Sequence, residues 1–159
     1  MGNRYSTSEV VELGVQIEKN GYVFYTTLAK NTKNKDSSTI FQFLAGEEEK
    51  HIDAFKKILE TVQTYEPQES YPDEYFSFLH DLASEYVFTQ ADKGKEIAQT
   101  INDDLKAIDM ALTFEDESIT FYEAMKKIIP HNEQSVIDAL IVQEHKHIDK
   151  LKLLKSTYK

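Results

Sequence analysis

A six-residue stretch that occurs twice decides the fold: Glu48-Glu49-Lys50-His51-Ile52-Asp53 and Glu144-His145-Lys146-His147-Ile148-Asp149. In each copy a Glu precedes a His by three residues, and the same Ile-Asp pair follows. Side chains three residues apart are neighbours on one face of an α-helix. Glu48 with His51, and Glu144 with His147, can therefore each close on a single metal ion.

Both copies lie on the inward faces of predicted amphipathic helices. Apolar residues recur around them at alternating spacings of three and four, which is the pattern of a helix in a bundle. The pattern predicts one helix over about residues 38–64 and another that begins near Asn132. The inward positions are Phe41, Leu44, Glu48, His51, Phe55, Ile58 and Val62 in the first of these helices, and Ile137, Leu140, Glu144, His147, Leu151, Leu154 and Tyr158 in the second.

Two further predicted helices carry one Glu each at the same kind of inward position. Glu18 interrupts the pattern of a helix over about residues 8–31, and Glu115 interrupts that of a helix that ends before Pro130. The candidate N-cap residues are Asp36 or Ser37 for the second helix, Asn102 or Asp103 for the third, and Asn132 for the fourth.

The two halves of the chain repeat one another. Glu18 is followed seven residues later by Tyr25, and Glu115 is followed seven residues later by Tyr122. Each half therefore supplies one helix with a single Glu and one helix with a Glu-x-x-His pair. The sequence predicts a single all-α domain over residues 1–159, a four-helix bundle whose halves are joined by one long crossover.

The crossover is predicted over about residues 65–104. Pro67 and Pro72 break the preceding helix. The spacing of Tyr75, Leu79, Leu82 and Tyr86 then predicts one short helix, which we expect to end near Gly94. The segment is rich in aromatic residues, so we expect it either to pack across the bundle or to cover a partner subunit.

Composition excludes several classes of function. The 159 residues carry a formal net charge of −10, which argues against nucleic acid or an anionic membrane as partner. There is no Cys, which excludes disulfides, thiolate nucleophiles and iron–sulfur sites. No stretch of the sequence is long and apolar enough to span a bilayer, and residues 1–12 lack the apolar core of a signal peptide, so we expect a cytoplasmic protein.

Four inward-facing carboxylates at one level of a bundle call for cations. Buried without partners, each would lose several kcal/mol of solvation or take up a proton. Two divalent ions balance the four negative charges, and two neutral imidazoles complete the set. Oxygen and imidazole ligands suit iron or manganese, and zinc is compatible with them.

The six residues carry a family resemblance. Glu18, Glu48, His51, Glu115, Glu144 and His147 resemble the ligand set of the ferritin-like di-iron carboxylate proteins, a class that the repeated Glu-x-x-His pattern typifies. The stretch from Leu112 to Tyr122 is similar to the third-helix pattern of the rubrerythrin-like branch, and Phe24-Tyr25 is similar to its first-helix pattern. The resemblance covers all four helices and implies a ferritin-like bundle.

The resemblance also implies a role for each residue. Glu18, Glu48 and His51 would serve mainly one iron, and Glu115, Glu144 and His147 the other, with Glu48 and Glu115 as the expected bridges. The hydroxyls of Tyr25 and Tyr122 can hydrogen-bond ligand carboxylates. Plain packing in the core is the alternative role of these two tyrosines.

Two departures from the rubrerythrin pattern stand out. Rubrerythrins carry an extra Glu three residues after the third-helix ligand, where this chain has Ser118, so the site is closer to the six-ligand pattern of bacterioferritins. Rubrerythrins also carry a Cys-rich rubredoxin domain that delivers electrons. Because this chain has no Cys, the electron donor is expected to be another protein or a small reductant.

Three functions are compatible with this reading. The first is a di-iron oxidoreductase that reduces hydrogen peroxide or O₂, as a homodimer that serves in oxidative stress. The second is a ferroxidase or iron-storage protein that uses the same six ligands in an assembly of many subunits. The third is a metal-stapled or metal-free helical bundle that binds a partner without catalysis.

Overall fold

Four long helices form the body of the protein. The computed structural model describes residues 7–62 and 73–158, and every regular element within these ranges is helical. The long helices are α1 (Thr7–Asn31), α2 (Lys35–Val62), α5 (Asp104–Lys126) and α6 (Gln134–Ser156). The predicted all-α bundle is thus confirmed. No helix among the described residues is long and apolar enough to cross a membrane.

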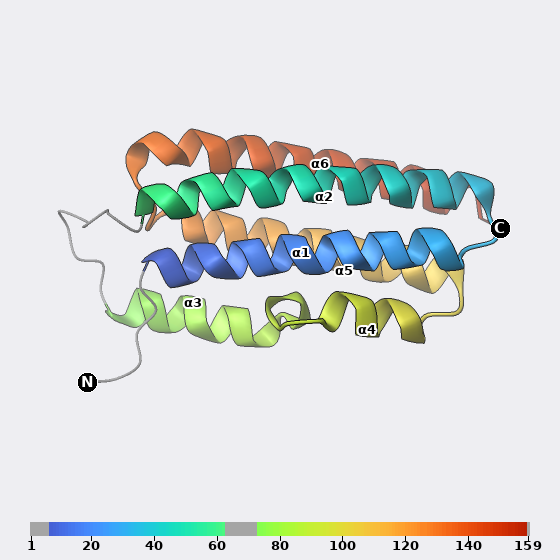
Figure 1. Ribbon diagram of the computed structural model, residues 1–159, viewed down its shortest axis with the longest axis horizontal. Helices are drawn as coiled ribbons and strands as arrows, with labels where there is room; N and C mark the ends of the chain where they lie inside the picture. The colour runs from blue at the N-terminus through green and yellow to red at the C-terminus, as the bar shows by residue number, and fades with distance from the viewer. Residues whose placement is uncertain (1–6, 63–72, 159) are drawn as a thin grey trace.

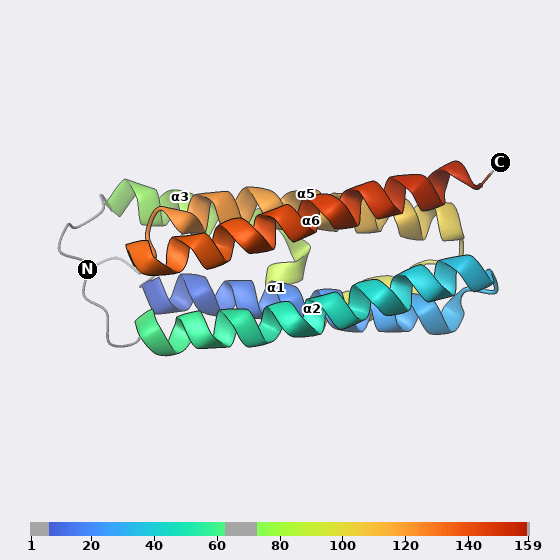
Figure 2. The same ribbon diagram turned by 90° about the horizontal axis from the view of Figure 1, so that it is seen from above.

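The four helices pair as two antiparallel hairpins, α1 with α2 and α5 with α6 (Figure 1). The second view shows the two hairpins lying against one another along their whole length (Figure 2). Since the crossover runs from one end of the bundle to the other, α5 lies antiparallel to α1 and parallel to α2. The Glu-x-x-His helices, α2 and α6, therefore run in opposite directions.

The inward positions predicted from sequence are the buried ones. The largest fully buried side chains include Tyr25, Tyr122, Phe41 and Phe55, which belong to the predicted inward faces. All predicted inward residues of α2 are buried, as are Glu18 of α1 and Glu115 of α5. Among those of α6 only Tyr158, beyond the end of the helix, is half-exposed. The period of the apolar pattern thus sets which face of each helix enters the core.

The helix ends were predicted with mixed success. Asp103 is the N-cap of α5, as expected, and its side chain accepts a hydrogen bond from the Lys106 backbone N–H at 2.9 Å. The expected caps of α2 were wrong, because Asn34 performs this role by accepting from the Ser37 N–H at 2.9 Å. Asn132 is not the cap of α6 either, since it lies inside a 3₁₀ turn, η2 (His131–Glu133), that precedes the helix.

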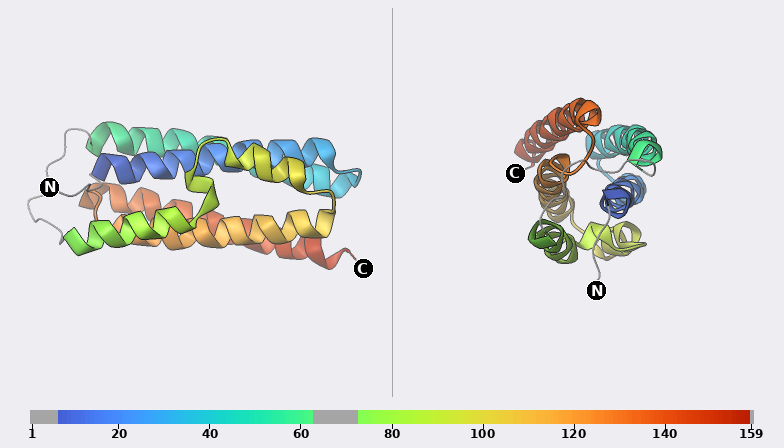
Figure 3. Two further views of the ribbon diagram at one scale, coloured as in Figure 1. Left: turned by 90° about the horizontal axis from the view of Figure 1, so that it is seen from below. Right: turned by 90° about the vertical axis from the view of Figure 1, so that its left-hand side faces the viewer.

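The crossover holds more structure than predicted. Where one short helix ending near Gly94 was expected, the chain forms α3 (Asp73–Glu85), the 3₁₀ turn η1 (Val87–Thr89) and α4 (Lys93–Thr100). Figure 3 shows α3 along α5, η1 crossing the bundle and α4 along α1. The described part of the crossover thus packs across its own bundle, and the predicted breaks at Pro67 and Pro72 lie outside the described residues.

One buried amide fastens the crossover to α1. The Asn20 side chain donates to the backbone carbonyls of Phe88 and Gln90, both at 2.7 Å, and accepts from the Gly94 N–H at 2.9 Å. A Cβ on Gly94 would lie 2.1 Å from the Asn20 carbonyl oxygen. Gly94 therefore lies in the first turn of α4 because two backbones meet there, and it does not end a helix.

Replacing Gly94 should therefore destabilise the fold. Gly94→Ala is expected to lower the free energy of unfolding by about 1–3 kcal/mol, the usual cost of overpacking, in urea denaturation of chelator-treated protein followed by circular dichroism. Gly46→Ala in α2 is the matched control, because a Cβ there meets nothing within 4 Å. That change should stabilise the helix by about 0.5–1 kcal/mol. Equal or greater stability of Gly94→Ala would contradict the close approach.

Candidate metal centre

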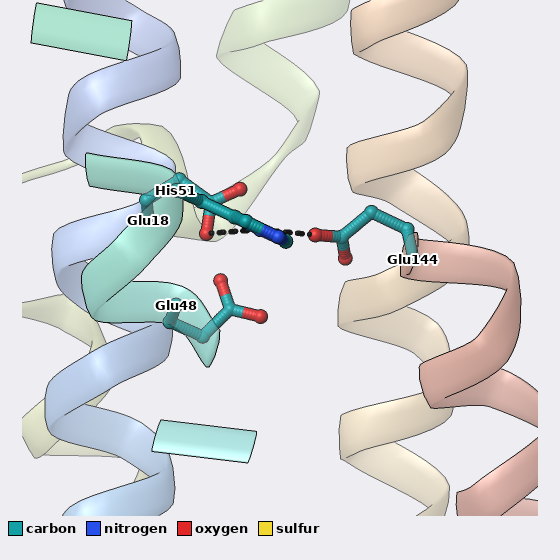
Figure 4. A group of neighbouring side chains, drawn as sticks. All are labelled: Glu18, Glu48, His51 and Glu144. Carbon is teal, nitrogen blue, oxygen red and sulfur yellow. Dashed lines mark ion pairs between the residues drawn. The ribbon is translucent and has the colours of Figure 1, made fainter. Parts of the chain in front are cut away.

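The six predicted ligands converge from all four long helices. Two groups of side chains each place their ligand atoms within 4.8 Å of one another, and all members are buried. The first group is Glu18, Glu48, His51 and Glu144, and the second is Glu48, Glu115, Glu144 and His147. Figure 4 shows the first group, with Glu18 on α1, Glu48 and His51 on α2, and Glu144 reaching in from α6.

Two carboxylates are common to both groups. Glu48 and Glu144 each belong to both, whereas Glu115 belongs to one. A carboxylate that bridges two ions must reach both of them, so the geometry favours Glu48 and Glu144 as the bridging pair. The expected bridge at Glu115 does not fit this arrangement. The reason is helix geometry: α2 and α6 each carry a Glu and a His three residues apart, and their Glu side chains meet between the two groups.

The histidines present the same ring nitrogen to the carboxylates. His51 Nδ1 lies 2.9 Å from Glu144 Oε1 and 3.5 Å from Glu18 Oε2. His147 Nδ1 lies 3.5 Å from Glu115 Oε1 and 3.7 Å from Glu48 Oε1. Their rings are stacked with centroids 5.7 Å apart and planes inclined by 16°. Nδ1 is therefore the candidate ligand atom of both histidines.

Two tyrosines form reciprocal hydrogen bonds between α1 and α5, the helices that carry one inward Glu each. The Tyr25 hydroxyl on α1 donates to Glu115 Oε1 on α5 at 2.6 Å, and the Tyr122 hydroxyl on α5 donates to Glu18 Oε1 on α1 at 2.7 Å. The predicted contact between these tyrosines and ligand carboxylates is thus confirmed. Each bond occupies one carboxylate oxygen and leaves the other, Oε2 of Glu18 and Glu115, free of hydrogen bonds.

The unsatisfied polar atoms of the described chain are confined to this cluster. Nine buried side-chain nitrogen or oxygen atoms lack a hydrogen-bond partner, and all nine belong to the six predicted ligands. An unpaired buried polar group costs about 1–3 kcal/mol, and more when it is charged. Lone pairs concentrated in this way, on four carboxylates and two imidazoles, are the donor set that divalent ions require. The residues present therefore fit a pair of such ions.

Burial also shifts the protonation of the cluster. Desolvation, reinforced by the neighbouring carboxylates, raises the pKa of Glu48 and of Glu144 well above the ordinary value. Burial, the largest single influence, acts to lower the pKa of His51, but the charges and hydrogen bonds of Glu18 and Glu144 together outweigh it and raise this pKa to about 11. Burial is likewise the largest influence on Glu18 and opposes its ionisation, yet the charge of His51 and the hydrogen bonds to this carboxyl together leave its pKa below the usual value. Protons and metal ions therefore compete for the same oxygens.

The lack of a side chain at Gly21 leaves room beside the cluster for Glu48 and Phe114. A Cβ on Gly21 would lie 2.7 Å from the Phe114 ring and 3.0 Å from Glu48 Oε2. Ser118, which stands where the rubrerythrin pattern has an extra Glu, is buried and donates to the Phe114 carbonyl at 2.8 Å. Its hydroxyl thus bonds its own helix. His145, to which the sequence assigns no role, is exposed.

One contact of the cluster escaped the sequence reasoning. His51 Nε2 lies 2.6 Å from Gln143 Oε1, and this bond fixes the ring with Nδ1 toward the carboxylates. Gln143 lies off the inward face of α6, and its exposed amide is neither charged nor titratable, so nothing in its type singles it out. The available signal was its position directly before Glu144, which places Gln143 beside the inward face of α6.

The pKa shifts predict the pH dependence of the metal-free protein. Carboxyls with a raised folded-state pKa stabilise the fold at low pH and lose that contribution as pH rises above 4.5 through the raised value. His51 acts in the same direction, because its contribution is present below pH 6.5 and lost toward pH 11. The melting temperature of chelator-treated protein should therefore fall between about pH 5 and 9.

The double variant Glu48→Gln/Glu144→Gln is the control for this dependence. It removes the two buried carboxyls whose pKa is raised well above the ordinary value and keeps their shape, so its melting temperature should fall less steeply over the same range. A wild-type melting temperature that stays level or rises with pH would contradict the assigned shifts.

Comparisons with known proteins agree with this geometry. Residues 9–155 match the family model described as Rubrerythrin. Among solved structures, the chain is similar to a Thermotoga maritima protein provisionally described as a ferritin-like diiron-carboxylate protein. The two share 22% sequence identity over 100% of both chains, with a TM-score of 0.70. At this identity the structural likeness supports the fold alone. A search of curated proteins gave no significant match.

Proposed function

The chain belongs to the rubrerythrin family, and we propose that its buried cluster binds two iron ions and uses them to reduce hydrogen peroxide or O₂. The observation that carries the proposal is the confinement of the unsatisfied buried atoms to the six predicted ligands. Four carboxylates gathered away from water have no cationic side chain of Lys or Arg among their recorded ion pairs. Two divalent cations supply the missing charge.

Each ion would take four protein ligands, two of them shared. Glu48 and Glu144 would bridge. Glu18 and His51 would complete one site, and Glu115 and His147 the other. Manganese or zinc suits the same ligands, but zinc has no redox chemistry, so the proposed reaction needs iron or manganese. Metal-ligating carboxylates are held in place by their own hydrogen bonds, a role that Tyr25 and Tyr122 fill.

The chemistry needs two electrons and a dry site. Two ferrous ions, when bound, supply one electron each, which together with two protons converts hydrogen peroxide to two molecules of water. The protein contributes a core that excludes bulk water and a ligand set whose charge is balanced. The tyrosine hydroxyls remain protonated donors, because burial raises the pKa of Tyr25 and Tyr122 well above 10.

The proposal includes two kinds of partner. A small oxidant would reach the buried cluster, and a separate electron-donor protein or small reductant would restore the ferrous state. A homodimer is the proposed assembly of this oxidoreductase.

Metal content tests the centre directly. Protein purified without added metal should contain close to two Fe or Mn ions per chain by elemental analysis, the content of a two-metal site. Glu48→Ala removes a bridge and should lose most of both ions. Glu49→Ala is the matched control, since the adjacent side chain is exposed on α2, and it should retain them. Wild-type protein without metal, and with a melting temperature unchanged by Fe²⁺, would overturn the proposal.

Peroxide kinetics then test the reaction. Ferrous-loaded protein mixed anaerobically with hydrogen peroxide should consume about one peroxide for every two Fe²⁺ oxidised, and a reductase system should sustain turnover. Oxidation of the iron without sustained turnover, with any donor tried, would reject the peroxidase reading.

Iron handling is the second candidate, and Ser118 favours it. With no further carboxylate contributed at that position, the described ligands form the symmetric six-residue set that a ferroxidase also uses. A ferroxidase that stores iron must form a shell of many subunits around a mineral core. Size-exclusion chromatography with light scattering after iron loading separates the two candidates: a shell-sized particle supports storage, and a dimer supports the oxidoreductase.

A further inference from the structure

The two halves of the bundle are related by an approximate two-fold symmetry around the cluster. Under this symmetry Glu48 corresponds to Glu144 and His51 to His147. The crossed tyrosine bonds obey it, since the bond from α1 to α5 at 2.6 Å has its counterpart from α5 to α1 at 2.7 Å. A contact found on one side of the cluster therefore predicts its counterpart on the other.

The ring contacts of the two histidines break this correspondence. His51 Nε2 is paired with Gln143 Oε1 at 2.6 Å. His147 Nε2 is buried and has no hydrogen-bond partner. Phe43 packs edge-on against the His147 ring, with centroids 6.5 Å apart, and offers no acceptor. A buried imidazole N–H without an acceptor is the kind of defect that native proteins repair.

The residue that corresponds to Gln143 is Glu47. It directly precedes Glu48 on α2, as Gln143 directly precedes Glu144 on α6. The Glu47 side chain is 20% exposed and lies 3.2 Å from Lys50 Nζ, on a side chain that is 79% exposed. Exposed ion pairs of this kind contribute little to stability. A change of side-chain rotamer is therefore enough to free Glu47 from Lys50.

We propose that Glu47 is the positioning residue of His147. Its carboxylate accepts the His147 Nε2–H and holds the ring with Nδ1 toward Glu115 and Glu48, as Gln143 holds His51. The inference rests on the proposed di-metal function and extends it. Because a carboxylate acceptor raises the donor strength of an imidazole more than an amide does, the two metal sites are inequivalent. His51 has an amide as the acceptor of its Nε2–H and His147 has a carboxylate, so the two ions bind with different affinities.

Titration of metal-free protein with Co²⁺, followed by its visible absorption, tests the inference without any catalytic readout. Wild-type protein should bind two equivalents. Glu47→Ala should weaken one of the two by roughly 10–100-fold, the usual effect of losing such a partner, and leave the other unchanged. Glu47→Gln keeps an acceptor and should restore part of the loss. Glu49→Ala, exposed on the same helix, should match the wild type.

Histidine backgrounds identify the ring on which Glu47 acts. In His147→Ala protein the further change Glu47→Ala should have no effect on Co²⁺ affinity, whereas in His51→Ala protein it should keep its full effect. Equal effects in both backgrounds, or a Glu47→Ala titration identical to the wild type, would overturn the inference and leave the di-metal function standing. A wild-type protein that fails to bind two Co²⁺ would overturn the proposed function and, with it, this inference.

Discussion

Four carboxylates buried at one level of a helical bundle are the constraint on which the rest of the structure depends. Glu18, Glu48, Glu115 and Glu144 are fully buried, one on each long helix. Apolar packing alone cannot hold like charges together in a medium of low dielectric constant. The surrounding residues therefore serve to orient these groups, and the fold provides four rigid helices that bring them to one place from two directions.

The helices meet this constraint through a small number of specific contacts. Tyrosine hydroxyls occupy one oxygen of each single-Glu carboxylate, and Gly21 leaves the space that Glu48 and Phe114 fill. The described part of the crossover, fastened by Asn20, packs mainly along α1 and α5. Of the six candidate ligands, the four of the Glu-x-x-His helices therefore lie on the side of the bundle away from α3 and α4 (Figure 3).

The sequence predicted a residue's role correctly where that role follows from the spacing of apolar residues along its helix. Ionisable residues such as Glu18 and His147 stand out because they interrupt an apolar spacing, and that spacing fixes the face on which they lie. It failed where the role depends on a neighbour distant in sequence. Gly94 has the type of a helix stop, but its position is dictated by the approach of Asn20. The contact of Gln143 and the place of Glu144 in both ligand groups depend on how α2 and α6 lie against one another, and the periodicity within each helix does not contain this information.

The crossed tyrosine–glutamate bonds have a consequence for how such a protein can be divided. Each hairpin carries both a donor and an acceptor, Tyr25 with Glu18 in one and Tyr122 with Glu115 in the other. Neither hairpin satisfies its own pair, but any two hairpins of this pattern satisfy each other. The covalent link between the halves is therefore not needed to form these hydrogen bonds. Two copies of one hairpin, related by a two-fold axis, would make the same pair of tyrosine–glutamate bonds, so in these bonds the bundle resembles a dimer of two hairpins joined in one chain.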